Sequence, residues 1–199
     1  LKNSRGEILK NIKGKYSSFI MDLSDEKVIK NIKKFKPDLI INLAAQAGVR
    51  HSLTNPDDYI KNNMSSFLNL VKYAKDHEVE KIIYASTSSV YGGNKDFPFK
   101  ESDRVDNPLQ FYAVTKRSNE LMANAFNDLY KINFIGLRFF TVYGPWGRPD
   151  MSIHKFTNLI SKNKPIDVFN YGRHTRDFTY VDDIVEGINL ISNKKNRYL

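Results

Sequence analysis

The chain has 199 residues, of which 41% are hydrophobic and 13% aromatic, enough to bury the core of one domain or one and a half. The absence of cysteine excludes a disulfide scaffold and thiolate metal sites. The formal net charge is +9, but the lysines are interleaved with Asp, Glu and Asn at helical spacing. A solvated basic surface explains such a pattern better than a nucleic-acid interface, so we expect no nucleic-acid partner.

No apolar stretch approaches the roughly 20 residues that a membrane-spanning helix requires, and the first residues do not resemble a signal peptide. We therefore expect a cytoplasmic protein with no membrane partner.

Helical and strand periodicities alternate along the chain, and several strands are apolar on both faces. Asn55 is expected to cap the second helix and Pro56 to occupy its first position. In chain order we expect a strand at 17–21, a helix at 25–35, a strand at 39–43, a helix at 56–77, a strand at 81–85, a long loop from Gly92, a helix at 108–130 and a strand at 134–140.

Buried strands separated by helices predict an α/β fold, a doubly wound parallel sheet that resembles the Rossmann fold. In such sheets ligands bind beyond the carboxyl ends of the strands. The unusual segments of this chain follow predicted strands and should line one crevice: Asp22-Leu23, Ala44-Ala45-Gln46, Ser86-Thr87-Ser88-Ser89 and Phe139-Phe140-Thr141.

No glycine-rich turn joins a strand to a helix, because Gly6 and Gly14 are isolated. Such a turn holds the pyrophosphate in dinucleotide-binding folds. We interpret residues 1–145 as a cofactor-binding domain that lacks its first βαβ unit. Residues 146–199 would form part of a smaller substrate domain, with a segment that returns to the sheet. This N-terminally truncated chain is expected to be inactive alone.

Two segments carry the chemistry. Hydroxyl side chains follow the strand at 81–85, and Tyr112 and Lys116 stand four residues apart, on one face of a helix. A nearby cation favours the phenolate and lowers the tyrosine pKa, which suits removal of an alcohol proton while hydride passes to a nicotinamide. Each segment alone is commonplace, since Tyr and Lys at this spacing occur on solvated helices and serine runs form turns.

Together, their order and separation resemble the extended short-chain dehydrogenase/reductases, and among them the NAD-dependent epimerase/dehydratase family. The resemblance implies that Thr87, Tyr112 and Lys116 are catalytic and that NAD is the cofactor. It also implies a set of cofactor contacts beyond Tyr112 and Lys116: Asp22 and Leu23 at the adenine, then Ala44, Ala45, Gln46, Asn63, Ser86 and Phe139. Helix capping by Asp22, tight packing of the alanines and a polar helix face at Asn63 are the competing explanations.

The residues after Thr87 bear on the reaction. Dehydratases that resemble this chain carry Asp-Glu there, and related uronate decarboxylases tend to carry a glutamate, whereas this chain has Ser88-Ser89. Hydroxyls in place of acids could donate hydrogen bonds to a substrate carboxylate without like-charge repulsion, which indicates a uronic acid as the substrate.

The segments 138–151 and 46–50 are similar to those of the UDP-glucuronate 4-epimerases. This similarity implies substrate contacts by Arg50, Thr87, Ser88, Ser89, Tyr112, Thr141 and Arg148, and Arg176 would hold the diphosphate by its planar fork.

The sequence therefore indicates NAD-dependent 4-epimerisation of a UDP-sugar, UDP-glucuronate to UDP-galacturonate, through a 4-keto intermediate. A UDP-N-acetylhexosamine 4-epimerase, a UDP-glucuronate decarboxylase and a non-catalytic NAD-binding scaffold remain alternatives. Asp182 and Asp183 are expected to cap the helix that follows them and not to hold a metal. The long helices at 56–77 and 108–130 suggest a homodimer, although both would also cover the sheet.

Overall fold

The computed structural model describes residues 14–27, 35–49 and 51–193. The chain forms two compact units. The first, here called the sheet unit, comprises Met21–Phe140 and Ile188–Leu199, and the second unit comprises Leu1–Ile20 and Thr141–Gly187. Among the helices of the described residues, none is long and apolar enough to cross a membrane.

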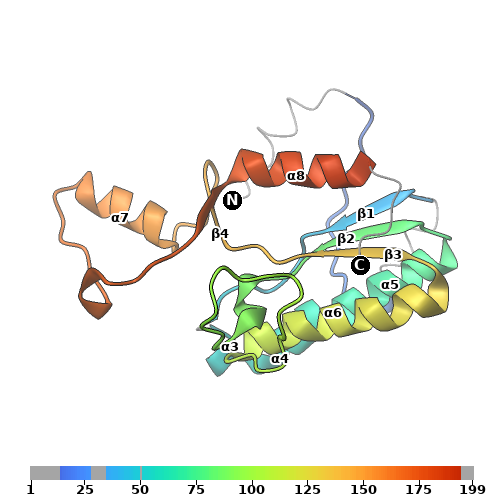
Figure 1. Cartoon of the computed structure of the whole chain (residues 1–199). Coiled ribbons are helices and arrows are strands. Elements are labelled where there is room, and N and C mark those ends of the chain that lie inside the picture. The colour runs from blue at the N-terminus through green and yellow to red at the C-terminus, as the bar shows by residue number, and fades with distance from the viewer. Residues whose placement is uncertain (1–13, 28–34, 50, 194–199) are drawn as a thin grey trace. The chain divides into compact units, whose positions relative to one another are not determined.

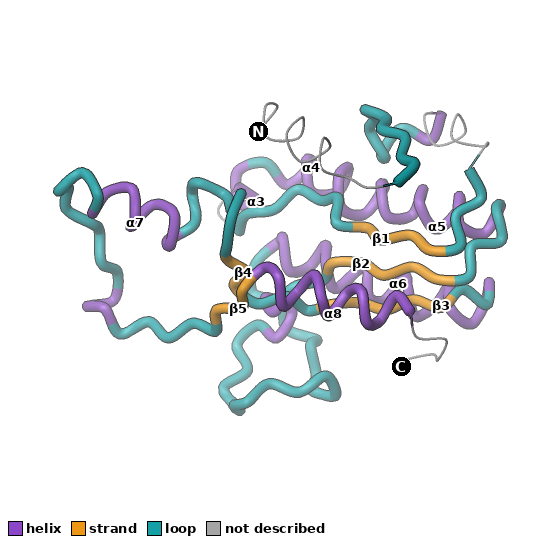
Figure 2. The backbone as a smooth tube through the Cα atoms, turned by 90° about the horizontal axis from the view of Figure 1, so that it is seen from above, coloured by secondary structure: helices purple, strands orange, loops and turns teal. Residues whose placement is uncertain are grey.

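The sheet unit is built on three parallel strands, β1 (Leu39–Asn42), β2 (Lys81–Ala85) and β3 (Asn133–Leu137), in the order β1-β2-β3. Figure 2 shows them side by side. Ile83 pairs with Ile41 on one side and Ile135 on the other. The predicted parallel α/β architecture is confirmed, and the carboxyl ends of all three strands lie at one edge of the sheet.

Helices connect the strands and cover one face of the sheet (Figure 1). Both crossovers step the same way across the sheet, and right-handed connections then place their helices on the same side. The helical segments of the sheet unit are α3 (His51–Thr54), α4 (Pro56–Tyr59), the π-helix Ile60–Ser65, α5 (Ser66–Asp76), the 3₁₀-helix Ser88–Tyr91 and α6 (Phe111–Tyr130).

The core lies between this helical layer and the sheet. Phe67 and Val71 of α5 pack against Ile82, Tyr84 and their neighbours, and the ring of Phe67 meets the ring edge of Tyr84 at a centroid distance of 5.1 Å. Phe67, Val71 and Ile82 are almost completely buried, which fixes α5 on the sheet.

The second unit contains a two-stranded parallel sheet of β4 (Thr141–Tyr143) and β5 (Phe178–Tyr180). Its other helices are α7 (Ser152–Ile160) and the short turn Asn170–Gly172. The helix α8 (Val181–Asn193) begins in this unit, one residue before Asp182. Asp182 and Asp183 therefore lie inside its first turn, where acidic side chains suit the helix dipole, and not at the expected capping position before the helix. Its last turn belongs to the sheet unit, where Lys81 Nζ donates to the Ser192 carbonyl at 3.0 Å.

Some predicted elements were wrong. Residues 17–21 form no strand, since neither of the two sheets in the described residues includes them, and Phe19 and Ile20 are exposed. The helix expected from 108 begins at Phe111, and the strand expected to reach 140 ends at Leu137, opposite the last residue of β2. Of the helix expected at 25–35, residues 28–34 lie outside the described residues.

The long helix after Asn55 begins at Pro56, as predicted, but the Asn55 side chain does not cap it. Instead, Asn55 Nδ2 donates to Thr54 Oγ1 at 2.9 Å and contacts His51 Nδ1 at 3.2 Å. Halfway along, the helix widens into the π-helix, in which the Ser66 amide bonds to the Lys61 carbonyl five residues before it. Such π segments are rare and often accompany functional sites.

Candidate active site

The hydroxyl turn follows β2 directly. Ser86 and Thr87 are buried, and Thr87 has an extended backbone (φ −158°, ψ 147°) that makes it the N-cap of the 3₁₀-helix Ser88–Tyr91. Thr87 Oγ1 accepts from the Ser89 amide at 3.2 Å and lies 3.3 Å from Ser89 Oγ. The Ser88 amide donates to the Phe139 carbonyl at 2.9 Å, which ties the turn to the segment after β3. Thr87, Ser88, Ser89 and Phe139 therefore lie together at the carboxyl edge of the sheet.

Lys116 reaches the same edge from α6. Its Nζ donates to the Ala85 carbonyl at 2.8 Å, and the residue is only 3% exposed. Burial disfavours the charged ammonium and lowers the Lys116 pKa from 10.5 to about 8. Tyr112 lies one helical turn earlier and is half-buried, with its ring edge-on to that of Tyr59 at 6.1 Å. The contact of Lys116 with Ala85, two residues before Thr87, brings the helix that carries Tyr112 and Lys116 to the hydroxyl turn.

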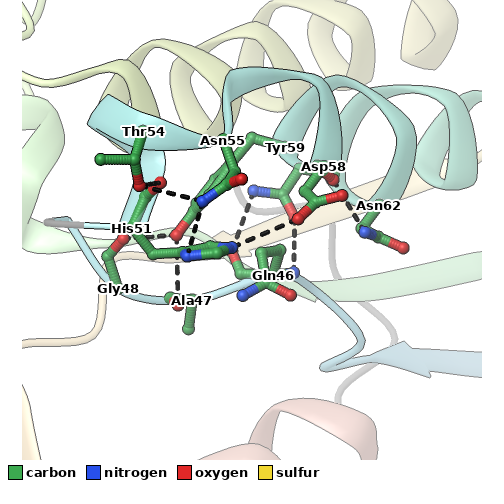
Figure 3. Close-up of polar contacts among 10 residues, drawn as sticks. Gln46, Ala47, Gly48, His51, Thr54, Asn55, Asp58, Tyr59 and Asn62 are labelled. Atoms are coloured by element: carbon green, nitrogen blue, oxygen red, sulfur yellow. Dashed lines mark hydrogen bonds and ion pairs between the residues drawn. The ribbon is translucent and has the colours of Figure 1, made fainter.

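The loop after β1 is held by the helix that follows it. Asn63 Oδ1 accepts from the Gln46 amide at 2.7 Å, while Asn63 Nδ2 donates to the Gln46 carbonyl at 3.1 Å and to Thr115 Oγ1 at 3.0 Å. The Tyr59 hydroxyl donates to the carbonyls of Ala47 and Gly48 (Figure 3). Asn63 therefore links this loop to the helix residue that precedes Lys116. These bonds use both hydrogens of the side-chain amide, a structural role that neither sequence interpretation included, and the predicted cofactor contact of Asn63 stays a prediction.

Ala44 and Ala45 begin this loop and are exposed. With only a methyl group at each position, the backbone at the carboxyl end of β1 is open to close approach by a ligand. Beside the loop, His51 Nε2 lies 3.2 Å from Asp58 Oδ2 on the exposed side of the helix start (Figure 3).

The helix that begins at Glu26 is capped by Asp25, whose Oδ1 accepts from the Lys27 amide at 2.9 Å. Asp22 instead closes the turn before that helix. Its Oδ1 accepts from both the amide and the hydroxyl of Ser24, and its Oδ2 pairs with Lys61 Nζ at 3.0 Å. These hydrogen bonds, first those from Ser24 and then that from Lys61, lower the pKa of Asp22 to about 2. The Leu23 carbonyl accepts from Asn69 Nδ2 at 3.1 Å, which fixes this turn against α5. The carboxylate is exposed, and its predicted adenine contact stays a prediction.

Of the predicted substrate residues of the second unit, Thr141 lies in a strand, and Arg148 and Arg176 lie on exposed loops. Thr141 begins β4, and its amide donates to the Asp177 carbonyl at 3.2 Å. Arg148 pairs with Asp150 through two hydrogen bonds, and Arg176 donates to the Thr175 carbonyl at 2.7 Å. Arg50 lies outside the described residues. The roles of these residues stay predictions.

Two functional candidates were missed by sequence reasoning. Tyr59 lies four residues before Asn63 and shares its buried helix face, a spacing that could have drawn attention to it. Glu120 lies four residues after Lys116, and its carboxylate accepts from Ser86 Oγ at 2.5 Å. The side chain of Ser86 is thus directed at Glu120.

The sequence matches the model of the NAD dependent epimerase/dehydratase family over residues 3–198. The chain belongs to this family. The resemblance inferred from the two motifs is therefore confirmed.

Relatives of this chain include UDP-sugar 4-epimerases. A probable UDP-glucuronate 4-epimerase of Rhizobium meliloti is 45% identical over 194 residues, which make up 97% of this chain and 57% of that protein. The solved UDP-glucuronic acid 4-epimerase of Bacillus cereus, in complex with UDP-glucuronic acid and NAD, has a TM-score of 0.88 at 32% identity and matches 98% of this chain. The UDP-N-acetylglucosamine 4-epimerase of Methanobrevibacter ruminantium has a TM-score of 0.81, also at 32% identity, and matches 89% of this chain.

This chain spans 61% of the length of the Bacillus chain and 57% of the Methanobrevibacter chain. The family member described here thus corresponds to somewhat more than half of each relative.

Proposed function

We propose that the protein is an NAD-dependent UDP-sugar 4-epimerase that converts UDP-glucuronate to UDP-galacturonate. The observation that carries the proposal is the contact of Lys116 Nζ with the Ala85 carbonyl. This bond brings a buried ammonium, on the helix that carries Tyr112, to the strand end that carries Thr87. A phenol, a cation and a hydroxyl at one sheet edge form a set suited to moving a proton on and off a secondary alcohol.

The described residues fit a nicotinamide dinucleotide. The exposed Ala44 and Ala45 leave the backbone accessible at the carboxyl end of β1. Asp22, in the turn before the helix that begins at Glu26, presents an exposed carboxylate. Lys116 would hold the nicotinamide ribose. When bound, NAD supplies the acceptor that takes hydride from the sugar C4 and returns it.

The chain's own residues supply the acid/base chemistry. Tyr112 takes the proton of the sugar 4-hydroxyl and later gives it back, Thr87 hydrogen-bonds the oxygen at C4, and the Lys116 charge favours the phenolate of Tyr112. Rotation of the 4-keto sugar between the two proton transfers inverts the configuration at C4.

The hydroxyls after Thr87 support a uronate substrate. Ser88 and Ser89 are half-buried and stand where an acid/base pair would be needed for dehydration. They would bind the carboxylate by hydrogen bonds and so restrain the 4-keto uronate, a β-keto acid, from losing carbon dioxide. UDP-N-acetylglucosamine is the competing substrate, because a structural relative is named for it.

Product analysis by NMR tests the proposal. The intact protein with NAD should convert UDP-glucuronate to UDP-galacturonate and should prefer it to UDP-glucose. Ser89→Ala should reduce this preference by roughly tenfold to a hundredfold and release more decarboxylated product, because it removes a hydrogen bond to a charged group. Equal turnover of UDP-glucose or UDP-N-acetylglucosamine by the wild type would refute the uronate assignment. Binding of NAD without turnover of any of the three sugars would support the scaffold alternative.

A further inference from the structure

A buried carboxylate on α6 has no part in the chemistry described above. The side chain of Glu120 is 9% exposed. It accepts hydrogen bonds from three side chains: Ser86 Oγ at 2.5 Å, Arg117 at 3.0 Å and Arg138 at 3.0 and 3.1 Å. The partners come from the end of β2, from α6 itself and from the segment after β3. Glu120 therefore joins three elements of the sheet unit at one point.

Arg138 orients this carboxylate. Its Nε donates to Oε1 and one terminal nitrogen donates to Oε2, a two-bond fork that fixes the plane of the carboxylate. Arg138 also lies over the ring of Tyr91 at 5.0 Å and donates to the Glu101 carbonyl at 3.2 Å. Burial alone would raise the pKa of Glu120, but the hydrogen bonds from Arg138 and Ser86 hold it below its usual value. Glu120 is therefore ionised at neutral pH and has a fixed orientation.

The contact with Ser86 connects Glu120 to the candidate catalytic residues. Lys116 and Glu120 are one turn apart on the same face of α6. Lys116 Nζ holds the carbonyl of Ala85, and Glu120 holds the hydroxyl of the next residue, Ser86. The residue after that is Thr87. One face of α6 thus forms hydrogen bonds to Ala85 and Ser86, the two residues immediately before Thr87, and the same helix carries Tyr112.

Two consecutive contacts define the position of a backbone more closely than one. The Ser86 and Ser88 amides bond to the carbonyls of Leu137 and Phe139 and so fix the turn relative to the β3 segment. The contacts of Lys116 and Glu120 fix it relative to α6, and a shift between α6 and the turn would move Thr87 relative to Tyr112. We propose that Glu120 is a positioning residue that, through Ser86, sets the distance of Thr87 from Tyr112. This inference rests on the proposed function, since it concerns the same reaction.

The decisive variant is Ser86→Ala in the intact protein. It removes the hydrogen bond from Ser86 to Glu120 but leaves the Glu120–Arg138 ion pair in place, so the protein should still fold. Glu120→Gln is a second variant, although it leaves Arg138 without its countercharge and so destabilises the protein. The matched control is Asp128→Asn, the same change from carboxylate to amide on an exposed residue of α6.

With the preferred UDP-sugar, Ser86→Ala should lower kcat by about tenfold to a hundredfold, because displacements of the order of 1 Å in a reacting group cost up to about a hundredfold. KM and the calorimetric Kd for the UDP-sugar should stay within about threefold, because binding does not depend on this contact. Asp128→Asn should behave as the wild type. In a Thr87→Ala background, Ser86→Ala should cost no further activity, because the residue it positions has been removed.

Ser86→Ala with wild-type kcat would overturn the inference, as would losses that simply add to those of Thr87→Ala. In either case an active wild type would leave the proposed function intact. A wild type inactive on every UDP-sugar would instead overturn the proposed function, and the inference with it.

Discussion

Replacing Lys116 with methionine tests whether burial sets the protonation of the candidate active site. Lys116 is 3% exposed, and its pKa falls from 10.5 to about 8 because the ammonium loses hydration. Between these two values the folded protein binds fewer protons at this side chain than the unfolded chain does. The free energy of unfolding should therefore rise with pH across this window. The contribution of Lys116 to stability should be least favourable below pH 8, where the buried side chain carries its charge.

The magnitude follows from the two pKa values. With 10.5 in the unfolded chain and about 8 in the folded protein, the contribution of Lys116 should improve by about 2 kcal/mol between pH ~7 and pH ~9.5. Lys116→Met has no ionisable group at this position, so it should lack this rise. Titrating groups other than Tyr112, whose pKa is expected to depend on Lys116, are common to both proteins and cancel in the comparison.

Urea denaturation of the intact wild type and of Lys116→Met at both pH values measures this difference. NMR of ¹³C-labelled lysine gives a direct check, since the Cε signal that the Met variant lacks should titrate near pH 8. The same pH dependence in both proteins, or a Cε signal that titrates near 10.5, would show that Lys116 is hydrated and would refute the reasoning.

Two further outcomes are expected. Tyr112→Phe in the intact protein should lower kcat by about 10²- to 10⁴-fold, since it removes one proton-transferring oxygen, and should leave the Kd for the UDP-sugar nearly unchanged. Steady-state kinetics measures the first and calorimetry the second. Activity within a few-fold of the wild type would exclude Tyr112 as the base. Phe67→Ala should lower the free energy of unfolding by about 3–5 kcal/mol, because Phe67 is 1% exposed and packs on Tyr84. The control Leu121→Ala removes an exposed side chain and should lower it far less. Equal losses in denaturation experiments would show that Phe67 is not part of the core.

The sequence predicted the elements whose signal is local. The strand β2 was predicted with its observed bounds because its apolar run is flanked by polar residues and lies in the centre of the sheet. The start of α6 was misplaced because Pro108 looks like a first helical residue. In the structure the Asn107 carbonyl instead packs so closely on Gly92 that a Cβ there would lie 2.1 Å from it, and the chain bends before the helix begins.

What the sequence could not reveal depends on partners far away in the chain. β4 forms a strand only because it pairs with β5, more than thirty residues later. Likewise, the acceptors of the Ser86 and Tyr59 hydroxyls could not be predicted, because Glu120 lies 34 residues from Ser86 and the carbonyls that accept from Tyr59 lie in the preceding loop. The catalytic candidates were found because the family motif fixes their spacing, whereas the residues that hold them have no such pattern.

The π-helix between α4 and α5 sets the rotation of α5 relative to α4 about the common helix axis. Tyr59 and Asn63 must point towards the Gln46 loop, while Phe67 and Val71 must point into the core. Each residue added to or removed from a helix rotates everything beyond it by about 100°. Deleting one residue from Ile60–Ser65 would restore an ordinary helix, but either the loop contacts or the core packing would then be lost. The helix can therefore vary in sequence at its surface but not in length, and natural insertions in this connection should fall outside it.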